Sequence, residues 1–351
     1  MKNCFLLLCL IFFTTNSTVF AQQISNPLDI SFGDPYILKS KGKYYLYGTG
    51  NKAGNRGFVA YSSDNMKDWK NEGLVYNKNQ EKAWGISAFW APEVYEKDGK
   101  YYFFYSAQWK DNPTNELENF KIGVAVADNP LGPFIDMYDR PIFDPGYPII
   151  DANVFWEDGK VYLYYSRCCY KHAVNSEVAE WAKWKNYFDK VEESWIYVVE
   201  MKPDFSGAVG EPQVLLTPPA KMNEHEWESR SVTSKEVGRR WTEGSFIFKH
   251  NDLYYMMYSS NNFDGENYAI GYATSKSPLG PFVKSVSNPI LQKDGGVTGT
   301  GHNSLLFDNG KIYCVYHGRT KKTGHKRMVF IDELEITKNG RIIIHGPTLH
   351  K

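Results

Sequence analysis

The stretch Asp151-Ala-Asn-Val-Phe, followed by the turn Glu157-Asp-Gly-Lys and the aromatic run Val161-Tyr-Leu-Tyr-Tyr, decides the fold of this chain. Two alternating strands joined by a tight Asp-Gly turn are the strongest short-range signal for a β-hairpin, because both central positions of such a turn need positive φ. The same pattern of a short opening strand and an aromatic strand occurs five times, with copies that begin at Asp34, Ala91, Asp151, Glu243 and His302.

The spacing of these copies is regular except in one place. The successive intervals are 58, 59, 92 and 59 residues, measured from Asp34 through Pro92, Asp151 and Glu243 to His302. A fixed period identifies a repeated unit of fold, so the long third interval indicates an insertion. Residues 171–193 have apolar side chains at helical spacing, and residues 219–240 are strongly charged. These two segments either pack on the edge of a repeat or border the mouth of a binding site.

Each repeat continues with two more strands. Ile122-Gly-Val-Ala-Val-Ala is typical of the third, and Pro130-Leu-Gly-Pro-Phe turns the chain into the fourth. Four strands per repeat with a period near 59 residues predict an all-β fold, a five-bladed β-propeller, in which the first strand of every blade faces a central funnel. We expect one catalytic domain over residues 22–351.

The N-terminus reads as a targeting segment. Lys2 precedes the apolar run Phe5 to Phe13, and the segment ends at Ala21. This pattern predicts a secretory signal peptide over residues 1–21 rather than a membrane span, with a mature protein that is secreted or periplasmic and begins at Gln22.

Composition restricts the class of partner. The chain has 40 Lys and Arg residues and 40 Asp and Glu residues, so nothing indicates a nucleic-acid partner, and a neutral one is expected. Aromatic residues make up 16% of the chain; most should fill the space between blades, and some can stack on sugar rings. The three cysteines after the leader, Cys168, Cys169 and Cys314, do not indicate a disulfide framework.

Three carboxylates begin inner strands, at positions that the repeats make equivalent. Asp34, Asp151 and Glu243 should therefore converge on the funnel axis although they lie far apart in sequence. Any one of them alone is as well explained as a turn residue. Three on one axis indicate acid/base chemistry, since facing carboxylates push their pKa values apart. With a neutral sugar, the reaction that uses them most naturally is glycosidic bond hydrolysis, in which one carboxylate activates water and another protonates the departing oxygen.

Six short motifs in register resemble glycoside hydrolase family 43. They are Asp34-Pro-Tyr-Ile, Trp90-Ala-Pro-Glu-Val, Ile150-Asp-Ala-Asn-Val-Phe, Thr242-Glu-Gly-Ser-Phe, Gly301-His-Asn-Ser and Arg327-Met-Val-Phe-Ile-Asp-Glu-Leu. The resemblance implies a five-bladed propeller that cleaves α-L-arabinofuranosyl or β-D-xylosyl linkages with inversion. It also implies that Asp34 is the general base, Glu243 the general acid and Asp151 the residue that modulates the pKa of that acid.

The chain departs from the family pattern in two places. Ser245 stands where the family often has Pro after Glu-Gly. This single difference hardly affects the resemblance to the family. We expect no C-terminal β-sandwich after the repeats, in contrast to many xylosidases of the family, and this favours an arabinofuranosidase over a xylosidase.

Four further residues are candidates for contact with substrate. Trp90 and Phe89 either form an apolar wall for the sugar or are buried between blades. His302 is either a hydrogen-bonded structural residue or one that touches the sugar; the resemblance also implies, in some arabinan-cleaving members, a calcium ion at this histidine that is otherwise surrounded by water. Arg327 is either a forked donor to sugar hydroxyls or a surface charge. No cofactor is required, and calcium would be structural.

The sequence thus predicts a secreted inverting glycosidase that releases arabinofuranosyl residues from arabinan or arabinoxylan. A β-D-xylosidase and an endo-acting arabinanase are alternatives from the same family. A non-catalytic carbohydrate-binding propeller is an alternative of another class, although it would have no use for both Asp34 and Glu243. A five-bladed hydrolase or phosphorylase with other catalytic residues also remains open, because fold does not determine function.

Overall fold

A computed structural model describes residues 24–50, 56–113 and 118–350 of the chain. Strands dominate these residues, so the all-β prediction is confirmed. The expected signal peptide, residues 1–21, lies outside the described part of the chain. Within the described ranges, no helix combines the length and the apolar character needed to cross a bilayer.

Three sheets have four antiparallel strands each, in chain order. The first contains β1 (Phe32–Ser40), β2 (Lys43–Gly50), β3 (Gly57–Ser63) and β4 (Lys70–Asn77). The second contains β5 (Gly85–Lys97), β6 (Lys100–Trp109), β7 (Phe120–Ala127) and β8 (Ile135–Asp136). The last contains β17 (Val297–Asp308), β18 (Lys311–Thr320), β19 (Met328–Ile336) and β20 (Ile342–Ile344).

A fourth sheet has eight strands and joins two repeats. Its members are β9 (Ile149–Glu157), β10 (Lys160–Arg167), β11 (Glu192–Met201), β12 (Ala208–Leu216), β13 (Arg239–His250), β14 (Leu253–Ser260), β15 (Ala269–Ser275) and β16 (Val283–Lys284). The N-terminal end of β11 extends beyond its pairing with β10 and runs parallel to β13, where Glu192 faces Arg239 and Glu193 faces Arg240. The insertion thus links two four-stranded units that the sequence pattern treats as separate.

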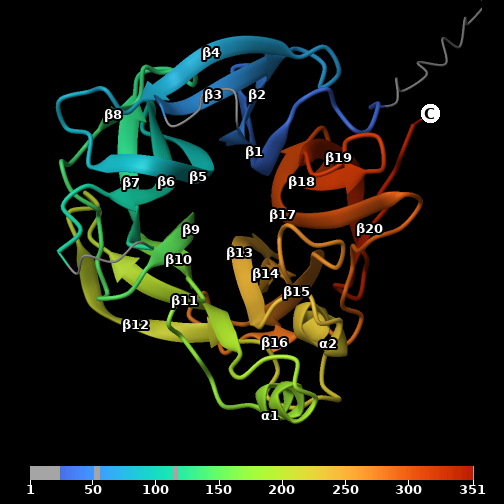
Figure 1. Cartoon of the computed structure of the whole chain (residues 1–351). Coiled ribbons are helices and arrows are strands. Elements are labelled where there is room, and N and C mark those ends of the chain that lie inside the picture. The colour runs from blue at the N-terminus through green and yellow to red at the C-terminus, as the bar shows by residue number, and fades with distance from the viewer. Residues whose placement is uncertain (1–23, 51–55, 114–117, 351) are drawn as a thin grey trace, which may run out of the picture.

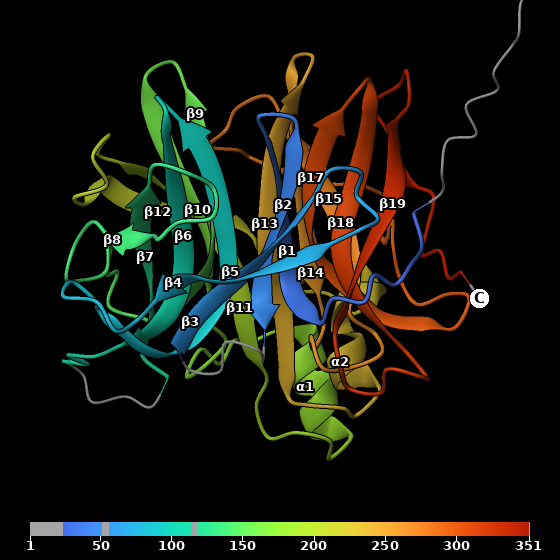
Figure 2. The ribbon, with the colours of Figure 1, turned by 90° about the horizontal axis from the view of Figure 1, so that it is seen from above.

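The sheets follow one another around a common axis, with β1, β5, β9, β13 and β17 toward the middle (Figure 1). Figure 2 shows the same sheets in a view across that axis. Strand β1 contacts β5 on one side and β17 on the other. The first and last repeats therefore meet, and the inner strands surround one central region.

Every inner strand carries a β-bulge at the same place. The register of its pairing shifts there, and the bulged residue has positive φ, which costs strain in a residue other than glycine. The bulged residues and their φ values are Asp34 (51°), Ala91 (44°), Asp151 (59°), Gly244 (59°) and His302 (49°).

The backbone N–H of each bulged residue donates to a side chain on the second strand of the preceding repeat. The bulge leaves this N–H group without a partner in the neighbouring strand, and the hydrogen bond to the side chain supplies one. The pairs are Ala91 to Thr49 Oγ1 (2.8 Å), Asp151 to Ser106 Oγ (3.0 Å), Gly244 to Ser166 Oγ (3.1 Å), His302 to Ser259 Oγ (2.7 Å) and Asp34 to His317 Nδ1 (3.1 Å). The bond from Asp34 to His317 closes the series, because it joins the first repeat to the last.

The register corrects the predicted equivalence of the three carboxylates. Gly33 faces Thr49 across its hairpin, and Glu243 faces Ser259 in the same way, so Glu243 matches Gly33 and not Asp34. The true counterpart of Asp34 is Gly244. The prediction was wrong by one residue, because the bulge adds a residue to the strand and the opening motif alone does not show which residue is bulged.

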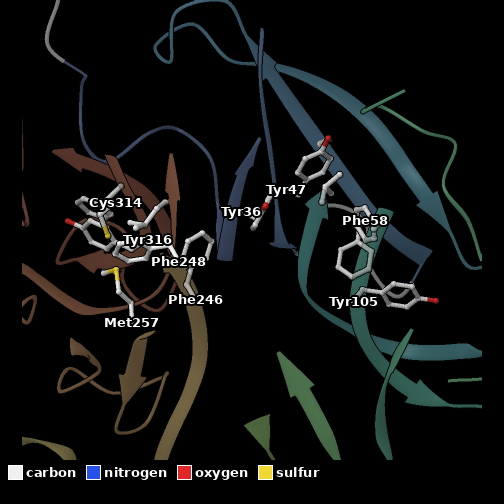
Figure 3. Close-up of a cluster of buried hydrophobic side chains, with 14 of the residues drawn as sticks. Tyr36, Tyr47, Phe58, Tyr105, Phe246, Phe248, Met257, Cys314 and Tyr316 are labelled. Atoms are coloured by element: carbon white, nitrogen blue, oxygen red, sulfur yellow. The ribbon is translucent and has the colours of Figure 1, made fainter. Parts of the chain in front are cut away.

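Aromatic side chains fill the interior between neighbouring sheets. Figure 3 shows one such cluster, in which the ring of Phe58 lies 5.1 Å from that of Phe103 and 5.7 Å from that of Tyr105. Cys314 is fully buried in the same cluster, as expected for a small apolar residue. Each tilted or edge-on ring pair contributes about 0.5 to 1.5 kcal/mol beyond its buried area.

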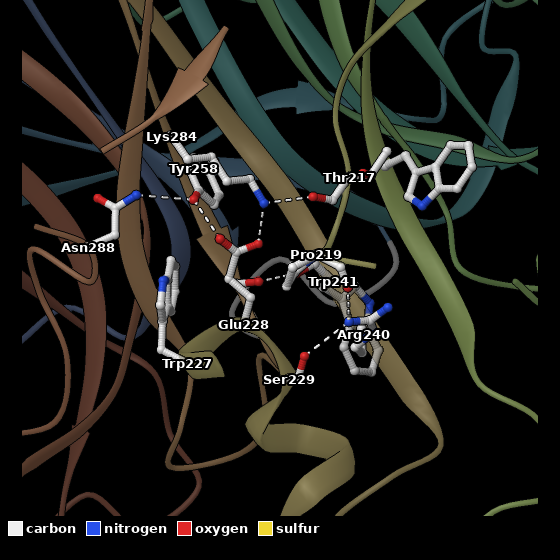
Figure 4. Close-up of polar contacts among 12 residues, drawn as sticks. Thr217, Pro219, Trp227, Glu228, Ser229, Arg240, Trp241, Tyr258, Lys284 and Asn288 are labelled. Atoms are coloured by element: carbon white, nitrogen blue, oxygen red, sulfur yellow. Dashed lines mark hydrogen bonds and ion pairs between the residues drawn. The ribbon is translucent and has the colours of Figure 1, made fainter. Parts of the chain in front are cut away.

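The first insertion contains less helix than its apolar spacing indicates, and the second contains only short helical turns. Residues 171–193 contain α1 (Glu177–Trp184), and residues 219–240 contain the 3₁₀ turn η2 (Glu226–Ser229) and α2 (Arg230–Thr233). Buried polar groups anchor the second insertion (Figure 4): Arg240 donates to Pro219 O at 2.7 Å and pairs with Glu193, while Glu228 accepts from Tyr258 and Lys284. Removing one partner of such a buried pair is strongly destabilising.

Candidate functional site

A cavity of about 580 Å³ opens at the centre of the ring of inner strands. Asp34 from β1, Asp151 from β9 and Glu243 from β13 all line it. The structure therefore brings together three carboxylates that the sequence separates widely. Val237 and Arg239, at the end of the second insertion, line the same cavity, so this insertion shapes the site as well as packing on a sheet.

Asp34 is held as an anion. Arg327 Nη1 lies 2.8 Å from Oδ1, and Thr49 Oγ1 donates to Oδ2 at 2.6 Å. His302 Nδ1 lies 3.3 Å from Oδ1. Burial by itself would raise the pKa of Asp34, but the positive charge of Arg327, with His302 and the bond from Thr49, outweighs burial and holds the pKa well below its usual range. An ionised carboxylate of this kind can accept a proton from water.

Gly33 leaves room for the guanidinium group of Arg327, which contacts Asp34. A Cβ atom on Gly33 would lie 1.9 Å from Cζ of Arg327. Any larger residue would displace the guanidinium from Asp34. The glycine before the first bulge is therefore required by the contact between Arg327 and Asp34.

Glu243 has the opposite electrostatic environment. Its side chain is buried, and Oε1 accepts a hydrogen bond from Tyr268 at 3.0 Å. Burial raises the pKa of Glu243 well above its ordinary value, and the nearby Asp151 raises it further, whereas the bond from Tyr268 and the charge of Arg327 act in the other direction. A carboxyl group that keeps its proton near neutral pH can act as a general acid.

Asp151 lines the same cavity as Glu243, and its negative charge raises the pKa of that acid. Ser166 Oγ donates to Asp151 Oδ2 at 3.0 Å. Burial and the charge of Asp34 raise the pKa of Asp151, while His302 and Ser166 lower it. Because two buried acids face each other here, the pair binds a proton more tightly than either acid would alone.

The two aromatic candidates have different surroundings. Trp90 lines the cavity, with its ring 4.5 Å from that of Phe120. Phe89 does not reach the cavity: its side chain is buried against Phe58 and Tyr76. Of the two alternatives for Phe89, burial between neighbouring sheets is therefore the one that agrees with its surroundings. Side chains alternate along a strand, so the neighbour of a residue that faces the cavity turns into the sheet interface.

His302 and Arg327 both line the cavity. Gly244 leaves space for His302, because a Cβ atom there would lie 3.0 Å from Nδ1 of the histidine. Calcium takes six to eight oxygen ligands. In the parts of the chain that the structure describes, no three or more His, Cys, Asp or Glu side chains are grouped so as to hold a metal ion. This finding concerns a site built from several protein ligands and does not test a calcium ion that is held by His302 and otherwise surrounded by water.

Several groups that contact the carboxylates were not predicted from the sequence. Tyr268 donates to Glu243, Thr49 donates to Asp34, and His317 accepts from the backbone of Asp34. Part of this set could have been found from the sequence, because the second strand of most repeats contains a tyrosine followed directly by a polar residue, as in Tyr105-Ser106 and Tyr316-His317. No comparable pattern marks Tyr268.

Comparisons with known proteins agree with this geometry. The profile of glycosyl hydrolases family 43 matches residues 24–342. The chain is 26% identical to a xylosidase/arabinosidase 43A of Humicola insolens, over 91% of this chain and 98% of that protein. It resembles the crystal structure of a thermostable family-43 glycoside hydrolase with 37% identity and a TM-score of 0.80, over 94% and 98% of the two chains. A solved endo-1,4-beta-xylanase from Bacteroides thetaiotaomicron VPI-5482 has 31% identity and a TM-score of 0.72, over 91% and 95%.

Proposed function

Because the chain belongs to glycosyl hydrolases family 43 and is a glycoside hydrolase, we propose that it releases α-L-arabinofuranosyl residues from plant polysaccharides such as arabinan and arabinoxylan. The observation that carries the proposal is that one cavity holds both Asp34, whose pKa is lowered by the neighbouring Arg327, and Glu243, whose pKa is raised by burial. The relative from Humicola insolens carries both xylosidase and arabinosidase in its name. A β-D-xylosidase is therefore the second candidate.

The proposed mechanism is a single displacement with inversion. Asp34 takes a proton from the attacking water, and Glu243 gives its proton to the departing glycosidic oxygen. Inversion requires room for water between the two carboxyl groups, at a separation of about 6.5 to 9.5 Å. Asp151 keeps Glu243 protonated in the resting enzyme. Arg327 keeps Asp34 ionised, and its remaining donors can bind sugar hydroxyls.

Substrate contacts are assigned to groups that line the cavity. Trp90 offers an aromatic face to the sugar, and His302 offers a ring nitrogen beside the base. A neutral sugar fits this region because the cations near the carboxylates already have anionic partners, as in the contact between Arg327 and Asp34. No step is assigned to a metal ion.

We further propose that residues 22–351 form a single five-bladed propeller. The protein is secreted after residues 1–21 have been removed as a signal peptide. Five bulges at matching places and five hydrogen bonds between successive repeats support the blade count. On this interpretation the eight-stranded sheet is two blades joined by the parallel pairing of β11 with β13.

The test compares catalytic variants on a panel of aryl glycosides, followed by arabinan and arabinoxylan. We expect Asp34→Ala to lose activity on every substrate, because water activation is always needed. Glu243→Ala should lose most activity on poor leaving groups and retain more on activated ones. The matched control is Asp128→Ala, which removes an exposed carboxylate from the turn that follows β7.

The outcome separates the classes of function. A wild type that binds arabinan without hydrolysing any substrate would support the carbohydrate-binding alternative. Faster turnover of the β-D-xyloside than of the α-L-arabinofuranoside would favour the xylosidase. The configuration of the released sugar, followed by ¹H NMR, tests inversion.

A further inference from the structure

Hydroxyl groups at equivalent positions on the second strands of two repeats donate hydrogen bonds to the carboxylates of the site. Thr49 accepts from the backbone N–H of Ala91 and donates to Asp34. Ser166 accepts from the backbone N–H of Gly244 and donates to Asp151. In both cases a backbone donor, which can only donate, occupies the hydroxyl oxygen and turns its proton toward the acid of the same repeat.

In the fourth repeat the hydroxyl cannot act in the same way, because Glu243 stands one residue before the bulge. Ser259 accepts from the backbone N–H of His302 at 2.7 Å, and its own hydrogen bond goes to Tyr268. Tyr268 then reaches Oε1 of Glu243 at 3.0 Å. Tyr268 therefore lies between Ser259 and Glu243, which stands one residue before the bulge. Its hydroxyl proton points to the carboxyl group of Glu243.

We propose that Tyr268 is a positioning residue for the general acid, whose hydroxyl occupies Oε1 of Glu243 so that the transferable proton resides on Oε2. The assignment rests on the proposed role of Glu243. In hydrolysis the Oε2–H bond breaks, the proton passes to the glycosidic oxygen as the bond to the anomeric carbon breaks, and Tyr268 continues to donate to the carboxylate that remains. The hydroxyl also favours the anionic product of that step.

The ring of Tyr268 is closely surrounded by its neighbours. It is 1% exposed and stacks on His317, with ring centroids 5.5 Å apart and planes 13° from parallel. Gly301 leaves room on another side, because a Cβ atom there would lie 2.1 Å from the ring. His317 in turn accepts from the backbone of Asp34. The same stacked pair thus supports the acid and the base.

Several other charged or titratable groups face Glu243. They remain in place when only the tyrosine hydroxyl is removed, and all of them line the same cavity: Asp34 from β1, Asp151 from β9, Cys168, Cys169 and Tyr170 after β10, Arg239 from β13, Asp264 before β15, His302 from β17 and Arg327 before β19.

The test is Tyr268→Phe, which keeps the ring and its stacking and deletes only the hydroxyl. We expect kcat/KM to fall about tenfold on poor leaving groups and much less on activated ones. The alkaline limb of the pH profile should move to higher pH, because a lost donor to the carboxylate raises the pKa of the acid. Tyr164→Phe is the matched control, since its buried hydroxyl donates to Pro278 O at 2.7 Å, away from the cavity.

A measurement without substrate keeps this test independent of the proposed function. The loss of Tm in Tyr268→Phe should be larger at alkaline than at acid pH, because the hydroxyl binds the ionised acid more strongly, whereas the loss in Tyr164→Phe should be the same at both. A wild type inactive on every glycoside would overturn the proposed function, and the Tm series would still decide the contact. Equal kinetic losses on all leaving groups, an unmoved alkaline limb and a pH-independent Tm loss would assign Tyr268 a purely structural role.

Discussion

Glu93, in the second repeat, should make the fold less stable as the pH rises. It is buried behind the site on β5, accepts from Asn153 Nδ2 at 2.9 Å and from Tyr95, and does not line the cavity. Burial, with a smaller contribution from Asp151, raises the pKa of Glu93 from 4.5 to about 8. The folded state thus keeps a proton that the unfolded chain releases, so this group destabilises the fold as the pH rises from about 4.5 to 8.

The magnitude follows from the two pKa values. One pKa unit is worth about 1.4 kcal/mol, so the contribution of Glu93 to the free energy of unfolding falls by about 3.5 kcal/mol between pH 5 and pH 8. Glu93→Gln keeps the shape of the side chain and cannot ionise. The variant should therefore gain about 3.5 kcal/mol relative to the wild type over this pH range.

The assay is urea unfolding of both proteins at pH 5, 6, 7 and 8, with midpoints and m-values from the same probe. Glu96→Gln, at an exposed position on the same strand, is the matched control and should follow the wild type. Other acids contribute equally to the wild type and to the variant, so the difference between them isolates Glu93. A difference that stayed constant with pH would refute the reasoning, because it would show that Glu93 is ionised in the folded state.

The remaining predictions concern the pH profile and metal dependence. Asp151→Asn should move the alkaline limb of kcat/KM to lower pH and lower the maximal rate, since a negative charge that raises the pKa of Glu243 is removed; an unmoved limb would leave Asp151 a binding or structural residue. Arg327→Met should move the acid limb to higher pH, because the charge that most strongly opposes the effect of burial on the pKa of Asp34 is then removed; a higher KM with an unmoved acid limb would show that the arginine only binds the sugar. Dialysis against EDTA should leave kcat/KM unchanged, and a loss restored by added calcium would contradict the metal-free mechanism.

Much of the fold could be predicted because its signals are local. A turn such as Glu157-Asp-Gly-Lys and an alternating strand on either side define a hairpin within one short segment. The regular spacing of the copies predicts the repeated sheets without knowledge of any long-range contact. Repetition also places Asp34, Asp151 and Glu243 near one axis, since equivalent strands around an axis face the same centre.

The pairing across the chain could not be predicted in the same way. The link between β11 and β13 depends on where the insertion returns, and no local pattern specifies that. Phe89 and Trp90 are neighbours with similar chemistry, and only the sheet's alternation, measured from a bulge, decides which of them reaches the cavity.

The sequence by itself determined the repeats, their turns and the identity of three acids on one axis, because these depend on residue type and spacing along the chain. Tertiary structure alone decided which acid keeps its proton. That outcome depends on burial and on charges and donors from distant segments: Arg327 beside Asp34, and Tyr268 and Asp151 beside Glu243. Electrostatic energies vary with distance through space, and distance along the chain does not specify them.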